Sequence, residues 1–548
     1  MMETPARGLR EGGVPQQQGR PALHGRVLGL NLAGEFLASA SCSGDRLALS
    51  VDGVDYSYSQ LAGVAGGMAA WLRSRDVGTG NRVGIVASRS VQAFAGILAT
   101  CWVGATYVPI NVALPPDALL RVFKTIKPDA LIADGRGAAA LSGLDFDRSK
   151  LLAPAQDALG ASRKGTGTAP SPSLVPEPLS AIDGPPCVPP EATAYVEFTS
   201  GTTGIPKGVM ISVGAVTHFL QVMQKRYNLN ADDRVAATSD ITFDISTFNV
   251  FMAWKAGASL HVVPASQLMA PAKFIRERQI TVWFSVPSTA TVMHRMHMLE
   301  PGAFPSLRYT LFCGEPLPLG PAVAWQKAAA NGIVENFYGP TEATVFCTVE
   351  PLGEHPNVTP GRGIVAIGRP LPGMEVAILD SALNLLPPNQ PGQIALSGPQ
   401  LARGYFGDPI LTQRQFPVIG GRRWYLTGDL GCEDSSGIFH FLGRIDNQVK
   451  VLGNRVELEE VETHLRDICK SDMVAALAWP IEHGSAQGLV AFVSATERSP
   501  SQVRQAMEKR VVSYMVPKVV HVLQALPLNS NGKIDRKALL RLLMDDHA

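Results

Sequence analysis

The sequence predicts an α/β protein with a large N-terminal domain of α/β sheets, a β-rich subdomain and a small C-terminal α/β domain. Three observations support this fold class. The chain has 548 residues, which is too many for one hydrophobic core. Strand-like and helix-like runs alternate up to about residue 370, as in proteins built around a parallel sheet. Short strands separated by turns follow, and then a second mixed pattern begins.

The first part of the chain contains clear helix and strand patterns. Residues 58–74 have the pattern of a helix and residues 82–87 that of a strand. The apolar window 91–110 is broken by glycines and a proline, so we expect a buried helix, a turn and a strand rather than a membrane span. Residues 1–25 carry arginines but no apolar segment, which predicts a disordered tail and no secretory signal.

The composition changes twice further along the chain. Residues 133–190 are rich in Ala, Gly, Ser and Pro, which predicts a linker or a surface excursion rather than core. The β-rich subdomain is expected from short strands at 374–379, 392–397 and 424–430. A polar joint at 443–457 precedes a predicted helix at 459–469, so residues 446–548 are expected to form the C-terminal domain and 26–445 the N-terminal one.

Composition excludes several classes of function. The formal net charge is +1, which provides no broad basic face for nucleic acid. The seven cysteines are scattered and never stand in C-x-x-C spacing. They predict a reducing, cytoplasmic location without a zinc site.

A loop rich in glycines and hydroxyls follows an apolar strand-like run that begins at Tyr195. The loop contains one lysine, Lys207, and its backbone N–H groups can turn toward a polyphosphate. It is not a Walker A loop, because G-x-x-x-x-G-K-[ST] does not occur. Taken alone, the loop is better explained as a polar surface turn.

Three carboxylates and one lysine stand in similarly ambiguous places. Asp244 lies among apolar neighbours and is either an N-cap or core ion pair, or the partner of a ligand cation or metal. Glu342 follows a turn in which Tyr338 can stack on a flat ring, and its oxygens suit Mg²⁺. Asp429 at the end of a predicted strand suits a ribose hydroxyl, or is a turn aspartate. Lys533 follows Asn-Gly in a tight turn, where it reaches a phosphate or only solvent.

The motifs FTSGTTGIPKGV, FDIS, YGPTE, YLTGD, GRIDNQVK and NGKIDRKAL occur in this order along almost the whole chain. In this order the chain resembles the adenylate-forming superfamily, and more closely the free-standing amino-acid adenylation enzymes of nonribosomal peptide synthesis. The resemblance implies that a carboxylate and ATP give an acyl-adenylate and pyrophosphate, after which a thiol takes the acyl group. It also implies that the C-terminal domain is mobile about a hinge at Asp446. Secondary metabolism, including antibiotic synthesis, is the implied setting.

The resemblance assigns roles to matching positions. The β- and γ-phosphates of ATP would contact Thr199, Ser200, Gly201, Thr202, Thr203 and Lys207. The adenine and ribose would contact Gly314, Glu315, Asn336, Tyr338, Asp429 and Arg444. Thr341 and Glu342 would serve the α-phosphate and Mg²⁺, with Glu342 as the metal ligand. Lys533 would stabilise charge in the transition state of adenylation and withdraw when the C-terminal domain rotates.

The resemblance also predicts the substrate. Asp244 would bind the α-ammonium of an amino acid. The rest of the pocket would be formed by Ile245, Phe248, Ser285, Leu311, Cys313, Phe337, Val345 and Phe346. Apart from Asp244 these positions are uncharged, which indicates a small uncharged side chain. The segment TLFCGEPLP is similar to D-alanine:carrier-protein ligases, so alanine is the first expectation. Glycine, serine, 2-aminobutyrate or a β-amino acid stay open, because one methylene discriminates weakly.

Two alternative functions share part of this pattern. An acyl- or β-aminoacyl-ligase with CoA or a carrier protein as acceptor shares the motifs, but Asp244 argues against a substrate without an ammonium. A catalytically inactive nucleotide-binding scaffold would not be expected to contain Lys533, Glu342 and Asp429 together. The chain ends soon after Lys537, so we expect a carrier protein with a phosphopantetheine arm to act in trans. A basic patch of Arg444, Lys450 and Arg455 is its expected dock.

Overall fold

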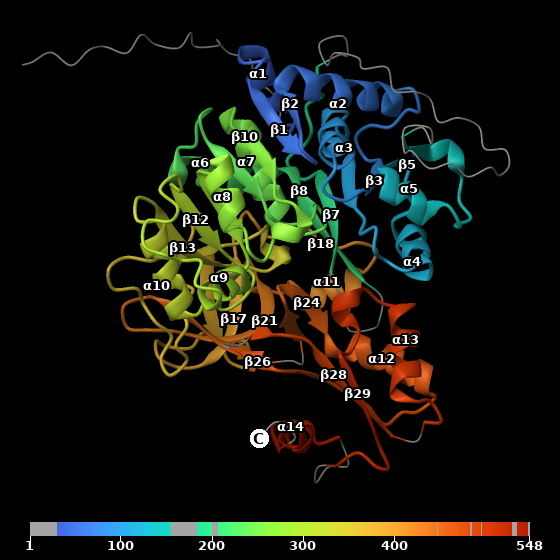
Figure 1. Ribbon diagram of the computed structural model, residues 1–548, viewed down its shortest axis with the longest axis vertical. Coiled ribbons are helices and arrows are strands. Elements are labelled where there is room, and N and C mark those ends of the chain that lie inside the picture. Colours follow the sequence, from blue (N-terminus) through green and yellow to red (C-terminus); the bar gives the residue numbers. More distant parts are fainter. Residues whose placement is uncertain are drawn as a thin grey trace, which may run out of the picture.

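A computed structural model describes residues 30–154, 184–199, 206–445, 448–482, 485–494, 496–528 and 534–545 (Figure 1). The expected N-terminal tail, the phosphate-loop residues 200–203, the hinge residue Asp446 and the catalytic candidate Lys533 lie outside the described residues. No helix in the described part of the chain is long and apolar enough to cross a membrane.

One sheet is built mainly from parallel strands of the first 200 residues. Its order is β18-β8-β7-β4-β3-β5-β6, and only β7–β8 and β8–β18 are antiparallel. The strands are β3 (Arg82–Val86), β4 (Thr106–Pro109), β5 (Ala130–Ala133), β6 (Leu151–Leu152), β7 (Thr193–Thr199), β8 (Lys207–Ser212) and β18 (Gly404–Tyr405). The helices that belong to this part are α2 (Tyr58–Arg73), α3 (Val91–Trp102), α4 (Pro116–Ile126) and α5 (Gly135–Leu141).

The sequence located most of these elements correctly. The helix at 58–74, the strand at 82–87 and the helix, turn and strand within 91–110 are confirmed. The expectation of a linker over 133–190 is wrong for its first part, because α5 and β6 lie there and Leu141 and Leu152 are fully buried. The small alanine and glycine residues beside them allow close packing. Composition alone had indicated a surface segment.

A second sheet contains nine strands in the order β15-β14-β13-β12-β11-β9-β10-β1-β2. All pairs from β13 to β1 are parallel. The strands are β1 (Leu47–Val51), β2 (Val54–Ser57), β9 (Arg234–Ala237), β10 (Ser259–Val262), β11 (Val282–Ser285), β12 (Tyr309–Phe312), β13 (Ile333–Tyr338), β14 (Thr348–Pro351) and β15 (Arg369–Pro370). Its helices are α1 (Gly34–Cys42), α6 (Val213–Tyr227), α7 (Ile245–Ala256), α8 (Ala272–Arg278), α9 (Pro287–Arg295) and α10 (Leu319–Ala328).

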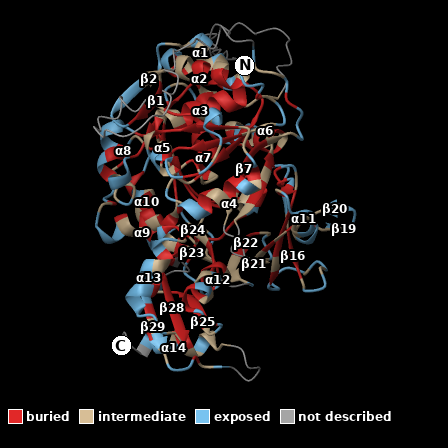
Figure 2. Ribbon diagram, turned by 90° about the vertical axis from the view of Figure 1, so that its right-hand side faces the viewer, coloured by how far each residue is buried: buried red, intermediate tan, exposed pale blue. Residues whose placement is uncertain are grey.

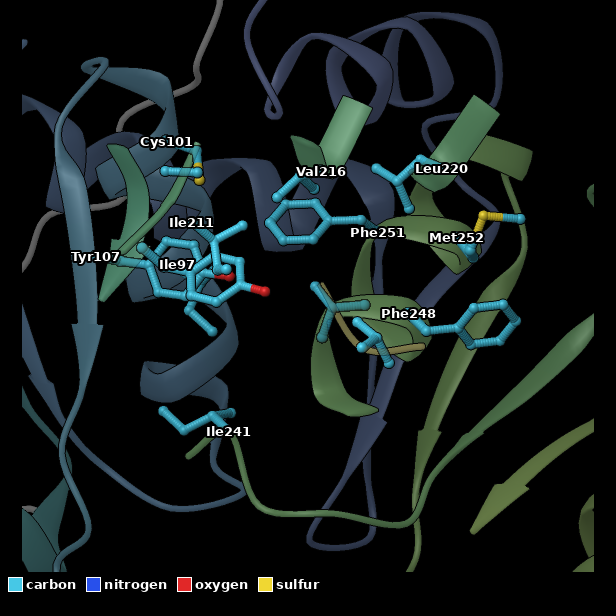
Figure 3. Packing of buried hydrophobic residues seen from close by; sticks show 14 of the residues in the cluster. Ile97, Cys101, Tyr107, Ile211, Val216, Leu220, Ile241, Phe248, Phe251 and Met252 are labelled. Atoms are coloured by element: carbon cyan, nitrogen blue, oxygen red, sulfur yellow. The ribbon is translucent and has the colours of Figure 1, made fainter. Parts of the chain in front are cut away.

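The two sheets share a core through α7. This helix is buried on all sides from Ile245 to Trp254, as expected for an element enclosed by other layers. Figure 3 shows Phe248 and Phe251 of α7 beside Tyr107 of β4 and Ile211 of β8, and the same hydrophobic cluster contains Val235 of β9 and Phe284 of β11. Because α7 is held by this packing, the residues at its N-terminus have a fixed position.

The β-rich subdomain follows the second sheet, as predicted. Its four antiparallel strands are β16 (Glu375–Leu379), β17 (Gly392–Ser397), β21 (Tyr425–Glu433) and β22 (Phe439–Arg444). Beside them lie α11 (Pro409–Gln415), β19 (Val418–Ile419) and β20 (Arg422–Arg423). One detail of the prediction is wrong: Asp429 lies within β21, opposite Arg444 of β22, and not at a strand end.

The C-terminal residues form two further sheets with hydrophobic clusters of their own (Figure 2). The sheets contain β23 (Gln448–Val451), β24 (Asn454–Glu457), β26 (Ile481–Glu482) and β27 (Ser485–Ala486), and β25 (Val474–Ala478), β28 (Leu489–Ser494) and β29 (Val519–Leu523). The helices are α12 (Leu458–Cys469), α13 (Pro500–Glu508) and α14 (Arg536–Asp545), so the predicted helix at 459–469 is confirmed. The domain boundary at 445/446 stays a prediction.

Candidate active site

A cavity of about 810 Å³ lies where the parallel strands β9, β11, β12 and β13 end. The carboxyl ends of such strands meet at one edge of the sheet, which is the usual place for a ligand site in α/β proteins. Two further elements close the cavity: strand β7 and the β23–β24 hairpin. The predicted site residues that line it are Thr199, Asp244, Ile245, Ser285, Cys313, Gly314, Glu315, Asn336, Phe337, Tyr338, Thr341, Val345, Asp429 and Arg444.

Asp244 precedes α7 at its N-cap position, but its side chain makes no capping hydrogen bond. Its Oδ2 accepts a hydrogen bond from Thr341 Oγ1 at 2.8 Å. Burial raises the pKa of Asp244 to about 6, although Thr341 and the charge of Lys450 oppose that shift. Of the two interpretations left open by the sequence, the geometry therefore favours a carboxylate that faces a ligand over a helix cap.

Aromatic rings close the end of the cavity beyond Asp244. The rings of Phe337 and Phe346 lie 4.1 Å apart between centroids, and Phe248 lies 6.2 Å from Phe346. Of the predicted pocket residues, Phe248, Leu311 and Phe346 are fully buried and lie behind the lining rather than on it. Apart from Phe337, the side chains of the predicted pocket residues at the wall are small or medium in size, and the rings behind them limit how far the wall can move.

The predicted nucleotide side of the cavity is preorganised by hydrogen bonds around Asp429. Tyr338 Oη donates to Asp429 Oδ2 at 2.5 Å, and Arg444 Nη1 lies 2.7 Å from Oδ1. Asp429 is 7% exposed. An acceptor held between a tyrosine and an arginine in this way keeps its orientation before any ligand arrives.

Several buried polar atoms at the cavity have no hydrogen-bond partner in the described part of the chain, and two of them belong to predicted nucleotide-binding residues. These two are Oγ1 of Thr199, at the start of the phosphate loop, and Oδ1 of Asn336, whose amide nitrogen donates to the Ala366 carbonyl at 2.8 Å. A buried acceptor or donor without a partner is costly. A phosphate oxygen would satisfy the Thr199 hydroxyl, and the amino group of adenine would satisfy Asn336 Oδ1. The site thus fits ATP.

Two ion pairs connect the cavity region to strand β24. Arg455 Nη1 lies 2.9 Å from Glu342 Oε2, and Lys207 Nζ lies 3.3 Å from Glu457 Oε1. Glu342 is 1% exposed and also accepts a hydrogen bond from Tyr405 at 2.8 Å. Burial alone would raise the pKa of Glu342, but Arg455 and Tyr405 bring it below its ordinary value. The predicted metal ligand and the predicted phosphate-binding lysine therefore both contact the C-terminal part.

The β23–β24 hairpin enters the cavity with Lys450, Gly453 and Asn454. Gly453 has a φ of +82°, and a Cβ at this position would lie 2.8 Å from Val286, so only glycine fits. By contrast, Ile534, the described neighbour of Lys533, packs in the cluster around α14. The hairpin, and not the segment next to Lys533, lies at the cavity in this structure.

The expectation of a basic dock near the joint stays a prediction. Arg444 is paired with Asp429, and Arg455 with Glu342, so part of the positive charge is already neutralised. Lys450 lines the cavity. All three residues are half-buried.

Sequence reasoning missed three acidic residues that line the cavity, Glu197, Asp240 and Glu460. Glu197 in the middle of β7 lines the cavity and is 5% exposed. The available signal was a glutamate inside the apolar run TAYVEFT, since a charged residue in a buried strand is rare without a function or partner.

These features define a class: an α/β enzyme whose nucleotide and substrate subsites adjoin in one cavity between two parts of the chain, as in adenylate-forming enzymes. The chain belongs to the AMP-binding enzyme family, because residues 36–406 match the family model of that description. Its similarity lies with nonribosomal-peptide-type adenylation domains. It is 30% identical over 495 residues to tyrocidine synthase 2 of Brevibacillus parabrevis, which covers 88% of this chain and 13% of the synthase.

Solved structures agree in fold over nearly the whole chain. The structure of the Vibrio cholerae adenylation domain AlmE in complex with glycyl-adenosine-5′-phosphate has a TM-score of 0.84 and 30% identity, and covers 96% of this chain and 100% of AlmE. The structure of IdnL7 has a TM-score of 0.68 and 31% identity, with coverage of 95% and 100%. The chain spans 13%, 44% and 21% of the lengths of tyrocidine synthase 2, tyrocidine synthase 1 and the Bacillus subtilis dimodular nonribosomal peptide synthase.

Proposed function

We propose that the protein activates a small uncharged amino acid with ATP and transfers the aminoacyl group to the phosphopantetheine thiol of a separate carrier protein. The observation that carries this proposal is the position of Asp244, whose carboxylate faces the same cavity as the nucleotide residues Asn336 and Asp429. A carboxylate there suits an ammonium, and an ammonium distinguishes an amino acid from a plain acid.

The chemistry has two displacement steps. In the first, an oxygen of the substrate carboxylate attacks the α-phosphorus of ATP, the bond to the bridging oxygen breaks, and pyrophosphate leaves. In the second, the thiolate attacks the acyl carbon, the bond to the phosphate oxygen breaks, and AMP leaves, while the thiol proton passes to solvent. Mg²⁺ would neutralise phosphate charge when bound, with Glu342 as its protein ligand.

The chain's own residues would divide this work. Asn336 would accept from the adenine amino group and Asp429 from the ribose hydroxyls. Thr199 and Lys207 would contact the outer phosphates, and Lys533 would stabilise the charge that builds during adenylation.

The observed position of the hairpin suits the second step. Lys207 and Glu342 are engaged by Glu457 and Arg455. Binding of ATP would therefore have to release both pairs before adenylation. Pyrophosphate departure would free Lys207 and Glu342 to contact the hairpin again, which would place the C-terminal domain for thiol entry. Residues of that domain, among them His464 and Tyr514, line the outer end of the cavity.

The substrate side chain is expected to be that of alanine or glycine. Cys313 and Ser285 at the wall leave a short space in front of the phenylalanine rings. The glycyl-adenylate in the AlmE structure supports a small amino acid here, since that protein is 30% identical over 96% of this chain.

The deciding experiment is amino-acid-dependent exchange of pyrophosphate into ATP, with a panel of small D- and L-amino acids, β-amino acids and plain carboxylic acids. We expect exchange with alanine or glycine, and strong loss in Asp244→Ala and Lys533→Ala. Exchange only with acids that lack an amino group, and indifferent to Asp244→Ala, would overturn the amino-acid proposal in favour of an acyl ligase.

A further inference from the structure

Glu197 occupies a place in the cavity for which the two displacement steps supply no role. Side chains of a strand alternate between its faces. In β7, Val196 belongs to the hydrophobic cluster around α4, and Phe198 packs against the same cluster. Glu197 is therefore directed to the opposite face, toward the N-terminus of α7, and it lines the same cavity as Asp244.

The surroundings of Glu197 contain more negative than positive charge. Burial raises the pKa of Glu197 well above its ordinary value, the charges of Asp244 and Glu342 add to this, and the backbone N–H of Asp244 opposes it. Tyr107 of β4 and Tyr195 of β7 also lie within electrostatic range, and neither supplies a cation.

Most cations that line the cavity contact groups other than Glu197: Arg89 and Arg362 donate to backbone carbonyls, and Arg510 pairs with Asp467. Arg444 pairs with Asp429, and Arg455 pairs with Glu342. Lys450 acts on Asp244. No ion pair formed within the described ranges includes Glu197, and residues 200–205, which follow β7, contain no lysine or arginine. The substrate end of the cavity thus holds two carboxylates and lacks one positive charge.

We propose that Glu197 and Asp244 together form the ammonium-binding subsite, and that this subsite selects substrates with a primary amino group. The inference rests on the proposed function and adds to it a second acidic residue and a restriction on the substrate. A primary ammonium has three N–H donors, so it can donate to both carboxylates and retain one donor. An N-methyl ammonium has two donors and a bulky group, which the enclosed cavity would have to place against a carboxylate.

The test compares ligand binding in wild type, Glu197→Gln and Glu197→Leu. The probes are 5′-O-(N-acylsulfamoyl)adenosines that carry an alanyl or a propionyl group, which differ only in the amino group. Glutamine keeps the acceptor for the Asp244 N–H and removes the charge, whereas leucine removes both. We expect the preference for the alanyl over the propionyl compound to fall about 10-fold in Glu197→Gln, because a charge-assisted hydrogen bond is lost. Binding of the propionyl compound should not weaken.

A matched control and a second readout separate this role from a structural one. Glu350 is also a buried glutamate on a strand, but it does not line the cavity and bonds to Asn357. Glu350→Gln should leave the alanyl-to-propionyl preference unchanged. In pyrophosphate exchange, Glu197→Gln should raise the KM for alanine but not for ATP, and should narrow the discrimination between alanine and N-methylalanine.

The experiment distinguishes failure of the Glu197 inference from failure of the proposed function. If wild type shows no exchange with any amino acid, the proposed function fails before Glu197 is tested. If wild type prefers the alanyl compound and Glu197→Gln retains the full preference, Glu197 does not bind the ammonium and this inference is overturned. Equal weakening of both compounds in Glu197→Gln, with a lowered melting temperature, would likewise overturn it in favour of a purely structural residue.

Discussion

Arg455 of β24 and Glu342 form an enclosed ion pair, with 2.9 Å between Nη1 and Oε2, that joins residues 113 positions apart. The same carboxylate is the predicted ligand for Mg²⁺. On the proposed function, this glutamate would have two competing partners, a cation of the C-terminal part and the metal that accompanies ATP. Competition of this kind would convert the presence of a nucleotide into a change of domain position.

The first prediction concerns this pair. Arg455→Gln should keep or increase pyrophosphate exchange, because Glu342 is freed, and should lower transfer to the carrier thiol at least about tenfold. Removing one partner of a buried pair costs about 3–5 kcal/mol, and part of that cost would shift the hairpin out of the cavity. The two half-reactions are measured separately, with Arg466→Gln as control, since Arg466 pairs with Glu462 within one helix. An equal fall in both half-reactions would contradict the prediction.

The second prediction concerns stability and follows from Asp244. Its pKa is raised from 3.8 to about 6 by burial, so the ionised carboxylate destabilises the folded state. Because the pKa of Asp244 is higher in the folded state, its contribution to the free energy of unfolding is fully present below pH 3.8. This contribution is lost as pH rises through about 6. At pH 7.5, Asp244→Asn should therefore be more stable by up to about 3 kcal/mol while losing activity. Denaturant unfolding at pH 7.5 and pH 4 measures the gain in the free energy of unfolding. An equal gain at both pH values would refute the prediction.

The third prediction is the pH dependence of amino-acid binding. An ammonium binds to the ionised form of Asp244, so kcat/KM for the amino acid should increase as pH rises through about 6. The apparent pKa of this pH profile belongs to Asp244 and its acidic neighbours together. Asp244→Asn should remove this dependence on pH, whereas the KM for ATP should be unaffected by the substitution over the same range. A pH dependence that persists in Asp244→Asn would assign the titration to another group.

These sites differ in how far the sequence could predict them. Asn336, Tyr338 and Asp429 are adjacent to recognisable motifs, and the strand ends of an α/β sheet bring such motifs together, so their shared cavity was predictable. The pair of Arg455 and Glu342 was not, because it depends on where the C-terminal part docks. Glu197 was visible as a charge in an apolar strand, but which face it occupied required the register of β7 with β8. The burial of Leu141 and Leu152 shows the converse case, in which composition indicated surface and packing made core.

The fourth prediction separates the nucleotide subsite from the amino-acid subsite. Asp429→Asn removes the charge held by Arg444 and Tyr338, and should raise the KM for ATP by about 10- to 100-fold through loss of charge-assisted hydrogen bonds. The KM for the amino acid should stay within about twofold. Glu375→Gln is the control, since Glu375 lies in the same sheet with its side chain 52% exposed. A matching rise in both KM values would show that the change had disturbed the whole cavity.

The last prediction concerns the size of the substrate. Cys313 directly follows β12 at the cavity wall, and its thiol has a pKa raised to about 12 by burial, so it acts as a small apolar side chain. Cys313→Leu should exclude alanine more than glycine, with a change in the ratio of their kcat/KM values of about 10- to 200-fold, the range for small steric differences. Cys347→Ala is the control, because Cys347 is buried but does not line the cavity. If Cys313→Leu lowers kcat/KM equally for alanine and glycine, the substrate side chain does not end at this cysteine. The space in front of Phe337 would then be tested next.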